Sequence, residues 1–549
     1  MTSIIENAAM RGMHDVRTED PRQSSIVNLK DEQLIEHKSS VLQEFYRDTH
    51  ILVTGGTGFM GKVLIQKLLR SCPHICTIYL LVRGKKGKSV QTRMQELFND
   101  PLFERLNLEQ PDFRSKVKAI QGDCSQPGLG LSSDDRQLLQ RNVNIVFHGA
   151  ATVRFDEKLK IAVNINVQGT RDLLLLCKDC LNIKVVMHVS TAYANCNRHD
   201  IGEELYDPPM PGDKAIQLVD CLSDEALTQF TPKLLGNWPN TYAFTKAIAE
   251  DTVKTYSKGL TVGIFRPSII VCTKNDPVSG WIDNLYGPTG AVVGVGVGMI
   301  RTMHINGKYM ADIVPCDMAI NGLISSAWDT YERRRCGEED IPVYNFVSSC
   351  ENPISWGDYI NLNIKHSWQA PFDNAIWMVT FTQTNVLFLY KIYALFLHLL
   401  PALLVDVVFF SVGHKPSMIK TYRKLHKFTD VISYFCTRQW KFSNKNVQQM
   451  WDKIGEDDRA IFDFNIRNLD WSSYFREALM GVRTFLLKED PKNLPQAIKK
   501  RYRLYWLHQI FKLSLLCLFL WLCWFIVITI LRWTAFTIST CQTIVDKVG

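Results

Sequence analysis

The first two thirds of the chain alternate between short apolar runs and stretches with the periodicity of a helix. Helical spacing of apolar residues follows the first run, over residues 62–69, and further helical stretches separate the later runs. Short runs that are apolar throughout are typical of strands buried on both faces of a parallel sheet. We therefore predict an α/β fold with a doubly wound parallel sheet, whose strands lie at 51–53, 78–82, 117–120, 145–147, 185–189 and 262–265.

Near its end the chain contains an apolar segment long enough to cross a membrane. Residues 513–531 form 19 consecutive positions without a charge. As a helix they would reach ~28 Å at ~1.5 Å per residue, close to the ~30 Å of a bilayer's hydrocarbon core. A buried helix or a tight hairpin of a soluble domain is the alternative, but large apolar side chains leave no polar face. We predict a transmembrane helix here.

Basic residues are distributed unequally around this segment, and positive charge stays on the cytosolic side of a membrane. This asymmetry predicts a single-pass membrane protein whose large N-terminal portion faces the cytosol. The last residues resemble neither a KDEL-like nor an SKL-like address, so the endoplasmic reticulum and the peroxisome both stay open as locations. The basic residues before the segment are Lys499, Lys500, Arg501, Arg503 and Lys512, and those after it are Arg532 and Lys547.

A second apolar stretch covers residues 386–410, but Lys391, His398, Pro401 and Asp406 interrupt it. Each of these residues is costly or awkward inside hydrocarbon. Two interpretations stay open. The stretch is either an amphipathic surface that dips into the membrane interface or lines an apolar tunnel, or a core helix pair broken at Pro401.

Length and composition exclude two classes of protein. A chain of 549 residues, 46% hydrophobic and 21% charged, is neither a single small module nor wholly disordered. The net charge of +8 is small for this length and identifies no partner. The 15 cysteines are scattered and the first thirty residues lack a signal-peptide core, which favours reduced thiols in a cytosol-facing protein. Neither a metal site nor a nucleic-acid-binding module is indicated.

The first predicted strand runs into a glycine-rich turn with glycines at Gly55, Gly58 and Gly61, followed by a helix. Glycine permits the tight turn, the close approach of a pyrophosphate and the close packing of the helix on the strand. The helix N-terminus adds free amides and a positive dipole for the phosphates. Together with the next strand at 78–82, this pattern predicts a dinucleotide site and hence a Rossmann-type fold.

The end of the next strand indicates which dinucleotide is bound. A carboxylate there would hold the ribose 2′-hydroxyl of NAD, whereas an arginine would accept the 2′-phosphate of NADP. Arg83 follows the strand, with Lys85 and Lys86 behind it and no carboxylate. A guanidinium pairs with phosphate through a fixed fork of donors. We therefore predict NADPH as the cofactor.

Candidate catalytic residues are Tyr242 and Lys246, four positions apart on a predicted helix, and Ser190 and Thr191 at the end of the strand 185–189. Residues four apart share a helix face, so Lys246 can hold its ammonium near the Tyr242 phenol and the cofactor ribose. A neighbouring cation and the nicotinamide charge would stabilise the phenolate and lower the tyrosine pKa from its ordinary ~10. Thr191, or Ser190 beside it, would donate a hydrogen bond to a substrate carbonyl.

In this order the glycine turn, the Ser-Thr pair, Tyr242 and Lys246 resemble the extended short-chain dehydrogenase/reductase superfamily. The match narrows to the fatty acyl-CoA reductases, which the chain resembles from about 48 to 490, with a terminal membrane segment typical of animal members. The phrases that carry this resemblance are Gly122-Asp123, Pro127-Gly-Leu-Gly-Leu131, His148-Gly-Ala-Ala151, Asn166-Val-Gln-Gly-Thr170, His188-Val-Ser-Thr-Ala-Tyr193, Phe265-Arg-Pro-Ser-Ile269, Asp312-Ile-Val-Pro315, Trp440-Lys-Phe-Ser-Asn444, Phe462-Asp-Phe464 and Asp470-Trp471.

The resemblance implies NADPH-dependent reduction of a long-chain fatty acyl-CoA to a primary alcohol and coenzyme A, by two hydride transfers through an aldehyde at a membrane surface. Tyr242 would be the proton donor, and Asp123 would meet the adenine. A homodimer is one alternative for the oligomeric state, which the sequence leaves open. The implied cofactor-binding residues are Thr54, Gly55, Thr57, Gly58, Phe59, Met60, Gly61, Arg83, Lys86, Asp123, Cys124, Gly149, Ala150, Asn166, Tyr242, Lys246, Pro267 and Ile269.

The same resemblance divides the chain into four parts: a polar leader (1–46) ending in a short helix near Tyr46, a catalytic Rossmann domain (47–345), a helical C-terminal domain (346–490) and the membrane helix (513–531). The 51-residue gap between Thr191 and Tyr242 contains Pro208, Pro209, Pro211 and Pro239, which predict an ordered insertion, either a lid over the thioester or a surface excursion without a role. Two other functions remain: reduction of a sterol or nucleotide-sugar carbonyl on the same fold, and a cofactor-sensing membrane scaffold.

Overall fold

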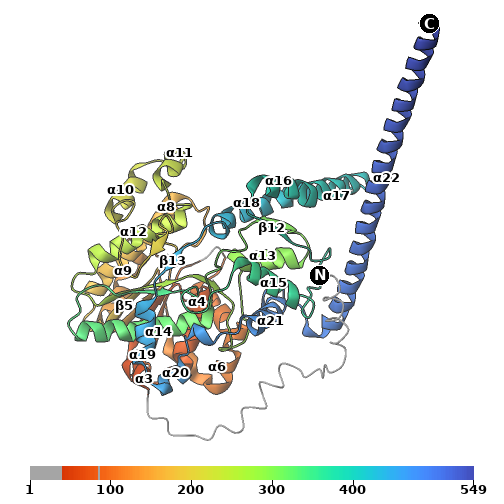
Figure 1. Ribbon diagram of the computed structural model, residues 1–549. Coiled ribbons are helices and arrows are strands. Elements are labelled where there is room, and N and C mark those ends of the chain that lie inside the picture. Colours follow the sequence, from red (N-terminus) through yellow and green to blue (C-terminus); the bar gives the residue numbers. More distant parts are fainter. Residues whose placement is uncertain (1–39, 85–86, 549) are drawn as a thin grey trace.

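A seven-stranded parallel sheet forms the centre of the molecule (Figure 1). The computed structural model describes residues 40–84 and 87–548, the last ten by their backbone alone. The strand order is β11-β7-β5-β4-β1-β2-β3, so the chain winds outward in both directions from β1, as predicted. The strands are β1 (His50–Thr54), β2 (Thr77–Val82), β3 (Val117–Gln121), β4 (Ile145–His148), β5 (Val185–Val189), β7 (Val262–Pro267) and β11 (Val343–Phe346).

Six of these strands confirm the predicted runs, whereas β11 was not predicted. It is only four residues long and pairs in parallel with β7, so that Val343 lies opposite Ile264 and Phe346 opposite Pro267. Asn345 interrupts its apolar residues, and its pairing along β7 is what defines the strand. The seventh strand extends the sheet on the side where the candidate catalytic residues lie.

Helices cover both faces of the sheet because its central strands are buried and largely apolar on both sides, whereas the edge strand β3 is mostly exposed. On one face α4 (Phe59–Ser71) packs beside α14 (Cys316–Arg335). On the other face α9 (Gly169–Lys178) packs against α12 (Thr241–Tyr256) and α7 (Ser133–Asn142). The two layers enclose separate apolar clusters, which leaves the carboxyl ends of the strands free to form a site. Smaller helices outside these layers are α5 (Val90–Phe98), α6 (Glu104–Glu109), α8 (Leu159–Val163) and α13 (Gly287–Gly296).

The predicted ordered insertion is confirmed as a folded segment. It contains β6 (Asp200–Ile201), α10 (Gly212–Cys221) and α11 (Asp224–Leu235). The hydroxyl of Ser223 caps α11 by accepting a hydrogen bond from the Ala226 N–H at 3.3 Å. A role for these helices as a lid stays a prediction.

The C-terminal region is helical and packs against the sheet domain through one continuous apolar cluster. The strand β13 (Lys441–Phe442) pairs with β6, and α19 (Lys445–Lys453) contacts β11. The predicted boundary at residue 345 lies inside β11, and the division into domains stays a prediction. The remaining helices of this region are α15 (Trp356–His366), α18 (Met418–Cys436), α20 (Glu456–Ile461) and α21 (Trp471–Gly481). Two short strand pairs lie outside the main sheet: β8 (Ile269–Val271) with β10 (Ile313–Pro315), both from the part before residue 345, and β9 (Thr302–His304) with β12 (Thr382–Thr384).

The short helix predicted near Tyr46 is α3 (Val41–Tyr46). It is bound to the body at both ends: the Leu42 N–H donates to Asp458 at 3.1 Å, and the Tyr46 hydroxyl donates to the Ile324 carbonyl at 2.7 Å. The rest of the predicted leader, residues 1–39, lies outside the described residues.

The second apolar stretch is one continuous helical segment rather than a broken pair. It comprises α16 (Leu387–Ala394), a π-helical turn (Leu395–Leu399) and α17 (Leu400–Ser411). Pro401 lies in the first turn of α17, directly after the π-turn, where a missing N–H is tolerated. Most of its large apolar side chains are exposed. The interpretation of a core helix pair broken at Pro401 is therefore wrong.

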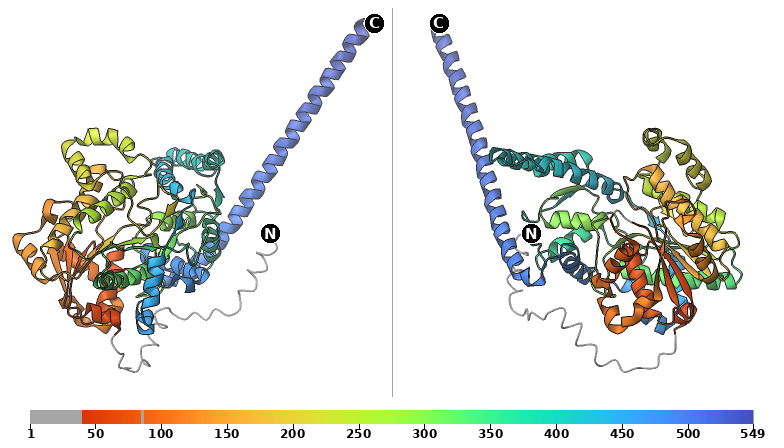
Figure 2. Two further views of the ribbon diagram at one scale, coloured as in Figure 1. Left: turned by 60° about the vertical axis from the view of Figure 1, so that its left-hand side comes forward. Right: turned by 180° about the vertical axis from the view of Figure 1, so that it is seen from behind.

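The chain ends in α22 (Leu494–Val548), an unbroken helix that extends far from the body (Figures 1 and 2). It contains the predicted segment 513–531 and is long and apolar enough to cross a membrane. Its first turns are bound to the body: Arg501 donates to Ser367 at 3.1 Å and stacks over Trp368, and His508 accepts a hydrogen bond from the Trp377 indole at 3.2 Å.

Candidate active site

The glycine-rich turn joins β1 to α4 and leaves room for a ligand backbone. Gly55 has a φ of +78°, and a Cβ there would lie 2.7 Å from the carbonyl carbon of Gly149 on the adjoining strand end. A Cβ on Gly61 would lie 2.3 Å from the Gly55 oxygen. Only glycine therefore allows the turn, the neighbouring strand end and the helix to pack this closely.

The first turn of α4 has free amides that suit a pyrophosphate. The helix begins at Phe59 with Gly58 as its N-cap, and no side chain caps it. Met60 also lies in this turn, and both side chains are partly buried. Uncapped N–H groups at a helix N-terminus bind anions well, so the cradle fits the phosphates of a dinucleotide.

The ends of β1 and β4 are held together by polar contacts around Thr54. The Thr54 hydroxyl lies 2.7 Å from Nδ1 of His148 and accepts a hydrogen bond from the Ala150 N–H at 3.2 Å. The Gly149 N–H donates to the Thr54 carbonyl at 3.1 Å. These contacts place Gly149 and Ala150 at the point where the strand order reverses, which is where Rossmann folds bind dinucleotides.

Arg83 lies exposed after β2, and the structure adds a second arginine that the sequence analysis missed. Arg93, on α5, donates to the Arg83 carbonyl at 2.8 Å and to the hydroxyl of Thr57 in the glycine turn at 2.7 Å. The pKa of Arg93 is lowered from its ordinary value by burial and by the positive charge of Arg83. Two guanidinium groups therefore flank the glycine turn. Lys86, the other predicted contact here, lies outside the described residues.

Asp123 and Cys124 follow β3 at the next strand end. One carboxylate oxygen of Asp123 accepts hydrogen bonds from the N–H and the hydroxyl of Ser125, both at 2.9 Å. Cys124 is buried against Gly169, where a Cβ would lie 2.6 Å from the Cys124 carbonyl oxygen. The position suits a contact between Asp123 and an adenine, which stays a prediction.

Tyr242 lies in the first turn of α12 with Thr191 as its hydrogen-bond partner. Its ring also contacts Phe155, at 5.8 Å between centroids. Burial raises the Tyr242 pKa to about 12, although the Thr191 hydrogen bond opposes the rise. In the protein alone, desolvation of the phenolate outweighs the other influences, and the lowering of this pKa with the nicotinamide bound stays a prediction. Tyr242 is a neutral phenol at physiological pH and is ready to donate a proton.

Lys246 is buried one turn further along α12, and its ammonium donates to the Val189 carbonyl at the end of β5, at 2.7 Å. Burial lowers its pKa from the ordinary value to about 8, and the negative charge of Glu250 opposes this change. The group is thus still mainly charged at neutral pH and sits within one helical turn of Tyr242.

Ser190 is directed away from the Tyr242 side and into a buried charged network. Its hydroxyl donates to Glu250 at 2.6 Å, and Glu250 forms a two-point ion pair with Arg266, at 2.8 and 2.6 Å. The Arg266 guanidinium also donates to the carbonyls of Gly202 and Glu204. The geometry thus favours Thr191 over Ser190 as a donor to substrate. No spacing in the sequence indicates the role of Glu250, because only the fold brings this residue of α12 to Arg266 of β7.

The other predicted contacts lie around the same strand ends. Asn166 belongs to a π-helical turn (Asn164–Gln168), where its side chain donates to Thr245 at 2.9 Å. Thr245 precedes Lys246, so Asn166 braces the helix that carries the catalytic pair. Pro267 ends β7 and accepts a hydrogen bond from the Ala192 N–H at 2.9 Å, and Ile269 begins the next short strand. π-turns of this kind are frequent at functional sites.

Within the part of the chain that the structure describes, no group of three His, Cys, Asp or Glu side chains is arranged to hold a metal. The cysteines whose side chains are described are all free thiols. The site therefore consists of the glycine cradle, two arginines and the group of Thr191, Tyr242 and Lys246.

This arrangement on a doubly wound sheet defines a nicotinamide-dependent oxidoreductase of the short-chain dehydrogenase/reductase type. Comparison with known proteins agrees. A family described as "Male sterility protein" matches residues 53–323 with its NAD-binding part and 397–489 with a second part. Fatty acyl-CoA reductase wat of Drosophila melanogaster is 42% identical over 91% of this chain and 94% of its own, and human fatty acyl-CoA reductase 1 is 39% identical over 83% and 88%. The chain belongs to the fatty acyl-CoA reductase family.

Solved structures with a similar fold are more distant in sequence. The reductase domain of a nonribosomal peptide synthetase from Mycobacterium tuberculosis has a TM-score of 0.53 at 16% identity, covering 80% of this chain and 93% of that one. The terminal reductase domain of the myxalamid pathway has a TM-score of 0.51 at 18% identity, covering 79% and 90%. These likenesses support the fold.

Proposed function

We propose that this protein reduces long-chain fatty acyl-CoA to the primary alcohol with NADPH. The observation that carries the proposal is the hydrogen-bonded pair of Tyr242 and Thr191, with Lys246 one turn away, beside a glycine cradle for a dinucleotide. The relatives named fatty acyl-CoA reductase indicate an acyl thioester as the substrate.

The chemistry has two reductive steps. A bound nicotinamide supplies hydride to the carbonyl carbon at each step. Tyr242 and Thr191 hydrogen-bond the carbonyl oxygen as negative charge develops on it, and Tyr242 gives up its proton there. The first product, a hemithioacetal, breaks its carbon–sulfur bond to release coenzyme A as the thiol and leave an aldehyde. A second hydride and a second proton convert the aldehyde to the alcohol, so two NADPH are consumed for each thioester.

A space for the acyl chain lies in the helical region. An apolar pocket of about 60 Å³ is lined by Val292 and Gly296 of α13, Tyr359 of α15, and Ile432 and Cys436 of α18. Phe435, next to Cys436, contacts Phe155, which in turn contacts the Tyr242 ring. The helix α18 therefore borders both the pocket and the catalytic tyrosine, which supports binding of the acyl chain along it.

The membrane helix follows from the same proposal. A long-chain alcohol is insoluble in water, and α22 would hold the site beside the bilayer that supplies the substrate and accepts the product. We propose a single membrane pass at 513–531 with the catalytic body on the cytosolic side, in the endoplasmic reticulum or the peroxisome.

The proposed function is tested by measuring products. Full-length protein in detergent, given palmitoyl-CoA and NADPH, is expected to form hexadecanol with two NADPH oxidised for each coenzyme A released. Chromatography of the lipids and a thiol assay measure both quantities. Aldehyde as the end product would reduce the reaction to one step, and no turnover with any acyl length would favour a sterol or nucleotide-sugar carbonyl.

The choice of NADPH depends on the two arginines at the glycine turn. Arg93→Ala is expected to weaken NADPH binding by about tenfold to a hundredfold, because a charge-assisted bond to the 2′-phosphate is lost, while NADH binding changes less than about threefold. Titration of each cofactor by nicotinamide fluorescence measures both affinities. Arg114→Ala is the matched control, because the Arg114 guanidinium lies over the rings of Phe98 and Phe113. Equal losses for the two cofactors would contradict a 2′-phosphate contact.

Lys246 predicts the pH dependence of the reaction. Because its pKa is lowered to about 8, the ammonium is present below that pH and is lost as the pH rises through it. We expect kcat/KM for the acyl-CoA to fall above about pH 8. A pH profile in Lys246→Arg should lose this limb, since a guanidinium stays charged. A flat profile in the unmodified protein up to pH 9.5 would contradict the role given to this ammonium.

A further inference from the structure

The helical segment α16–α17 has two very different sides. One narrow stripe is buried against the body, made of residues spaced four apart: Tyr390, Ala394, His398, Ala402 and Asp406. Such spacing keeps these residues on one side of a helix. The remaining circumference is covered with exposed large apolar side chains, namely Val386, Leu387, Phe388, Leu389, Leu395, Phe396, Leu400, Leu403, Leu404, Val405, Val407, Val408, Phe410 and Val412.

Polar bonds along the buried stripe hold the segment lengthwise on the protein. The Asp406 carboxylate accepts three hydrogen bonds from the first N–H groups of α18, those of Ser417, Met418 and Ile419, at 2.8–2.9 Å. His398 accepts a hydrogen bond from the Arg301 N–H at 2.9 Å. Crossing a bilayer would break these bonds and bury their groups in hydrocarbon, which is costly. The segment is therefore a fixed surface of the body and not a second membrane span.

The charges beside this surface are almost all positive. Between residues 386 and 429 the only carboxylate side chain is that of Asp406, which is already bound. The basic side chains in the same range are exposed: Lys391, Lys415, Lys420, Arg423, Lys424 and Lys427. An apolar helix fringed by lysine and arginine is the arrangement that anionic lipid headgroups attract.

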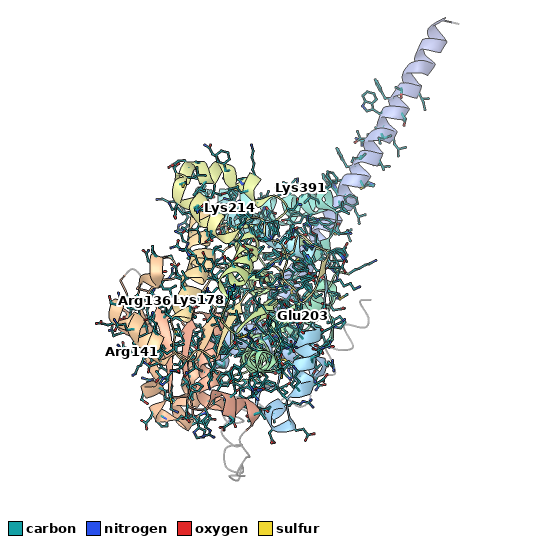
Figure 3. All side chains as sticks on the ribbon, turned by 90° about the vertical axis from the view of Figure 1, so that its left-hand side faces the viewer. Arg136, Arg141, Lys178, Glu203, Lys214 and Lys391 are labelled. Carbon is teal, nitrogen blue, oxygen red and sulfur yellow. The ribbon has the colours of Figure 1, made fainter. Side chains whose placement is uncertain are left out.

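The position of the surface suits the bilayer proposed for α22. Figures 1 and 2 show α16 and α17 running across the direction of α22, at the end of the body toward which α22 projects. Figure 3 places Lys391 at this end, whereas Arg141 and Lys178 lie on the body away from it. A helix that crosses the direction of a membrane span lies parallel to the membrane plane.

We infer that α16–α17 lies in the interface of the bilayer that α22 enters, with its apolar side among the acyl chains and the basic residues at anionic headgroups. The inference rests on the proposed membrane span of α22. It also gives the acyl pocket a route to lipid. The Thr429 hydroxyl of α18 lies 3.4 Å from the Tyr390 hydroxyl of α16, and Ile432 and Cys436 of the same helix α18 line the pocket.

Fluorescent labels on the full-length protein test the inference. The exposed native thiols are replaced by serine, and each variant then carries one cysteine labelled with an environment-sensitive dye. Phe388→Cys and Leu404→Cys label the apolar side of α16–α17, Leu520→Cys labels α22, and Leu108→Cys labels an exposed position on α6. The protein is reconstituted into vesicles of phosphatidylcholine with phosphatidylserine. Iodide in the water and nitroxides on the lipid measure which phase surrounds each dye.

We expect the dyes at 388 and 404 to be quenched by lipid nitroxides and to be about threefold or more less accessible to iodide than the dye at 108. Lipid contact at 520 alone, with 388 and 404 as accessible as 108, would overturn the inference and leave the span of α22 intact. Water around all four dyes would overturn both. Crosslinking of two copies through position 404, without lipid contact, would assign the surface to a second copy of the chain.

A charge reversal tests the headgroup contact separately. Lys420→Glu with Lys424→Glu should reduce lipid quenching at 404 about twofold or more, because basic residues beside an anionic surface are attracted to its headgroups and carboxylates are repelled. Arg141→Glu with Lys178→Glu, the same change of charge away from the surface, should leave it unchanged. Equal effects of the two double variants would contradict a specific basic fringe.

Discussion

Tyr242→Phe is expected to lower kcat by about a hundredfold to ten-thousandfold, which is the usual contribution of a positioned proton donor. The phenol is neutral because burial raises its pKa to about 12, and it is hydrogen-bonded to Thr191. The variant keeps the ring and its contact with Phe155, so the fold and the NADPH affinity should change little. Single-turnover oxidation of NADPH in the presence of palmitoyl-CoA measures the hydride step directly.

Tyr256→Phe is the matched control for this experiment. It removes the same hydroxyl from the same helix, where that hydroxyl bonds Asp213 at the protein surface. Its activity should stay within about twofold of the unmodified protein. Retention of more than about a tenth of kcat in Tyr242→Phe would exclude the phenol as the acid and would leave Thr191 or a water molecule as the proton source.

Arg266→Met is expected to produce the largest loss of stability. The change leaves the Glu250 carboxylate buried without its two-point partner, and removing one member of a buried ion pair costs about 3–5 kcal/mol of unfolding free energy. For a protein of this size the apparent Tm should fall by roughly 3–5 °C. Intrinsic tryptophan fluorescence during heating in detergent measures the shift at a fixed scan rate.

The double variant Arg266→Met with Glu250→Gln separates charge from packing. Neutralising the carboxylate as well removes the unpaired buried charge, so the double variant should be more stable than Arg266→Met alone. If the losses of unfolding free energy measured for Arg266→Met and for Glu250→Gln simply add in the double variant, packing holds the network and the ion pair contributes nothing specific. Arg335→Met, at an exposed surface pair with Glu332, should shift the Tm by less than about 2 °C.

Much of the fold could be predicted because the signals were local. Six strands are short apolar runs, and the glycines at 55, 58 and 61 mark one turn between a strand and a helix. The seventh strand, β11, escaped prediction because Asn345 interrupts its apolar residues, and only its pairing with β7 defines it. The helix break predicted at Pro401 does not occur, because a π-turn just before this residue accommodates the proline in a continuous helical segment.

The site was predicted less completely because its parts come from distant positions. Arg93 reaches Thr57 across 36 residues, and Glu250 reaches Arg266 from a helix to a strand. Neither contact has a spacing that a sequence pattern reveals. The rise of the Tyr242 pKa in the protein alone could not be predicted for a related reason, since burial depends on how the surrounding elements close over the phenol.

The unbroken helix α22 limits how the catalytic body can move. Its first turns are bonded to the body through Arg501 and His508, and no loop interrupts it before the apolar segment. A catalytic body joined to its membrane anchor by a flexible linker can rotate freely, whereas one joined by a continuous helix keeps a fixed orientation relative to the bilayer. In the proposed membrane arrangement, every turnover would therefore deliver its alcohol with the same orientation and at the same depth of the lipid.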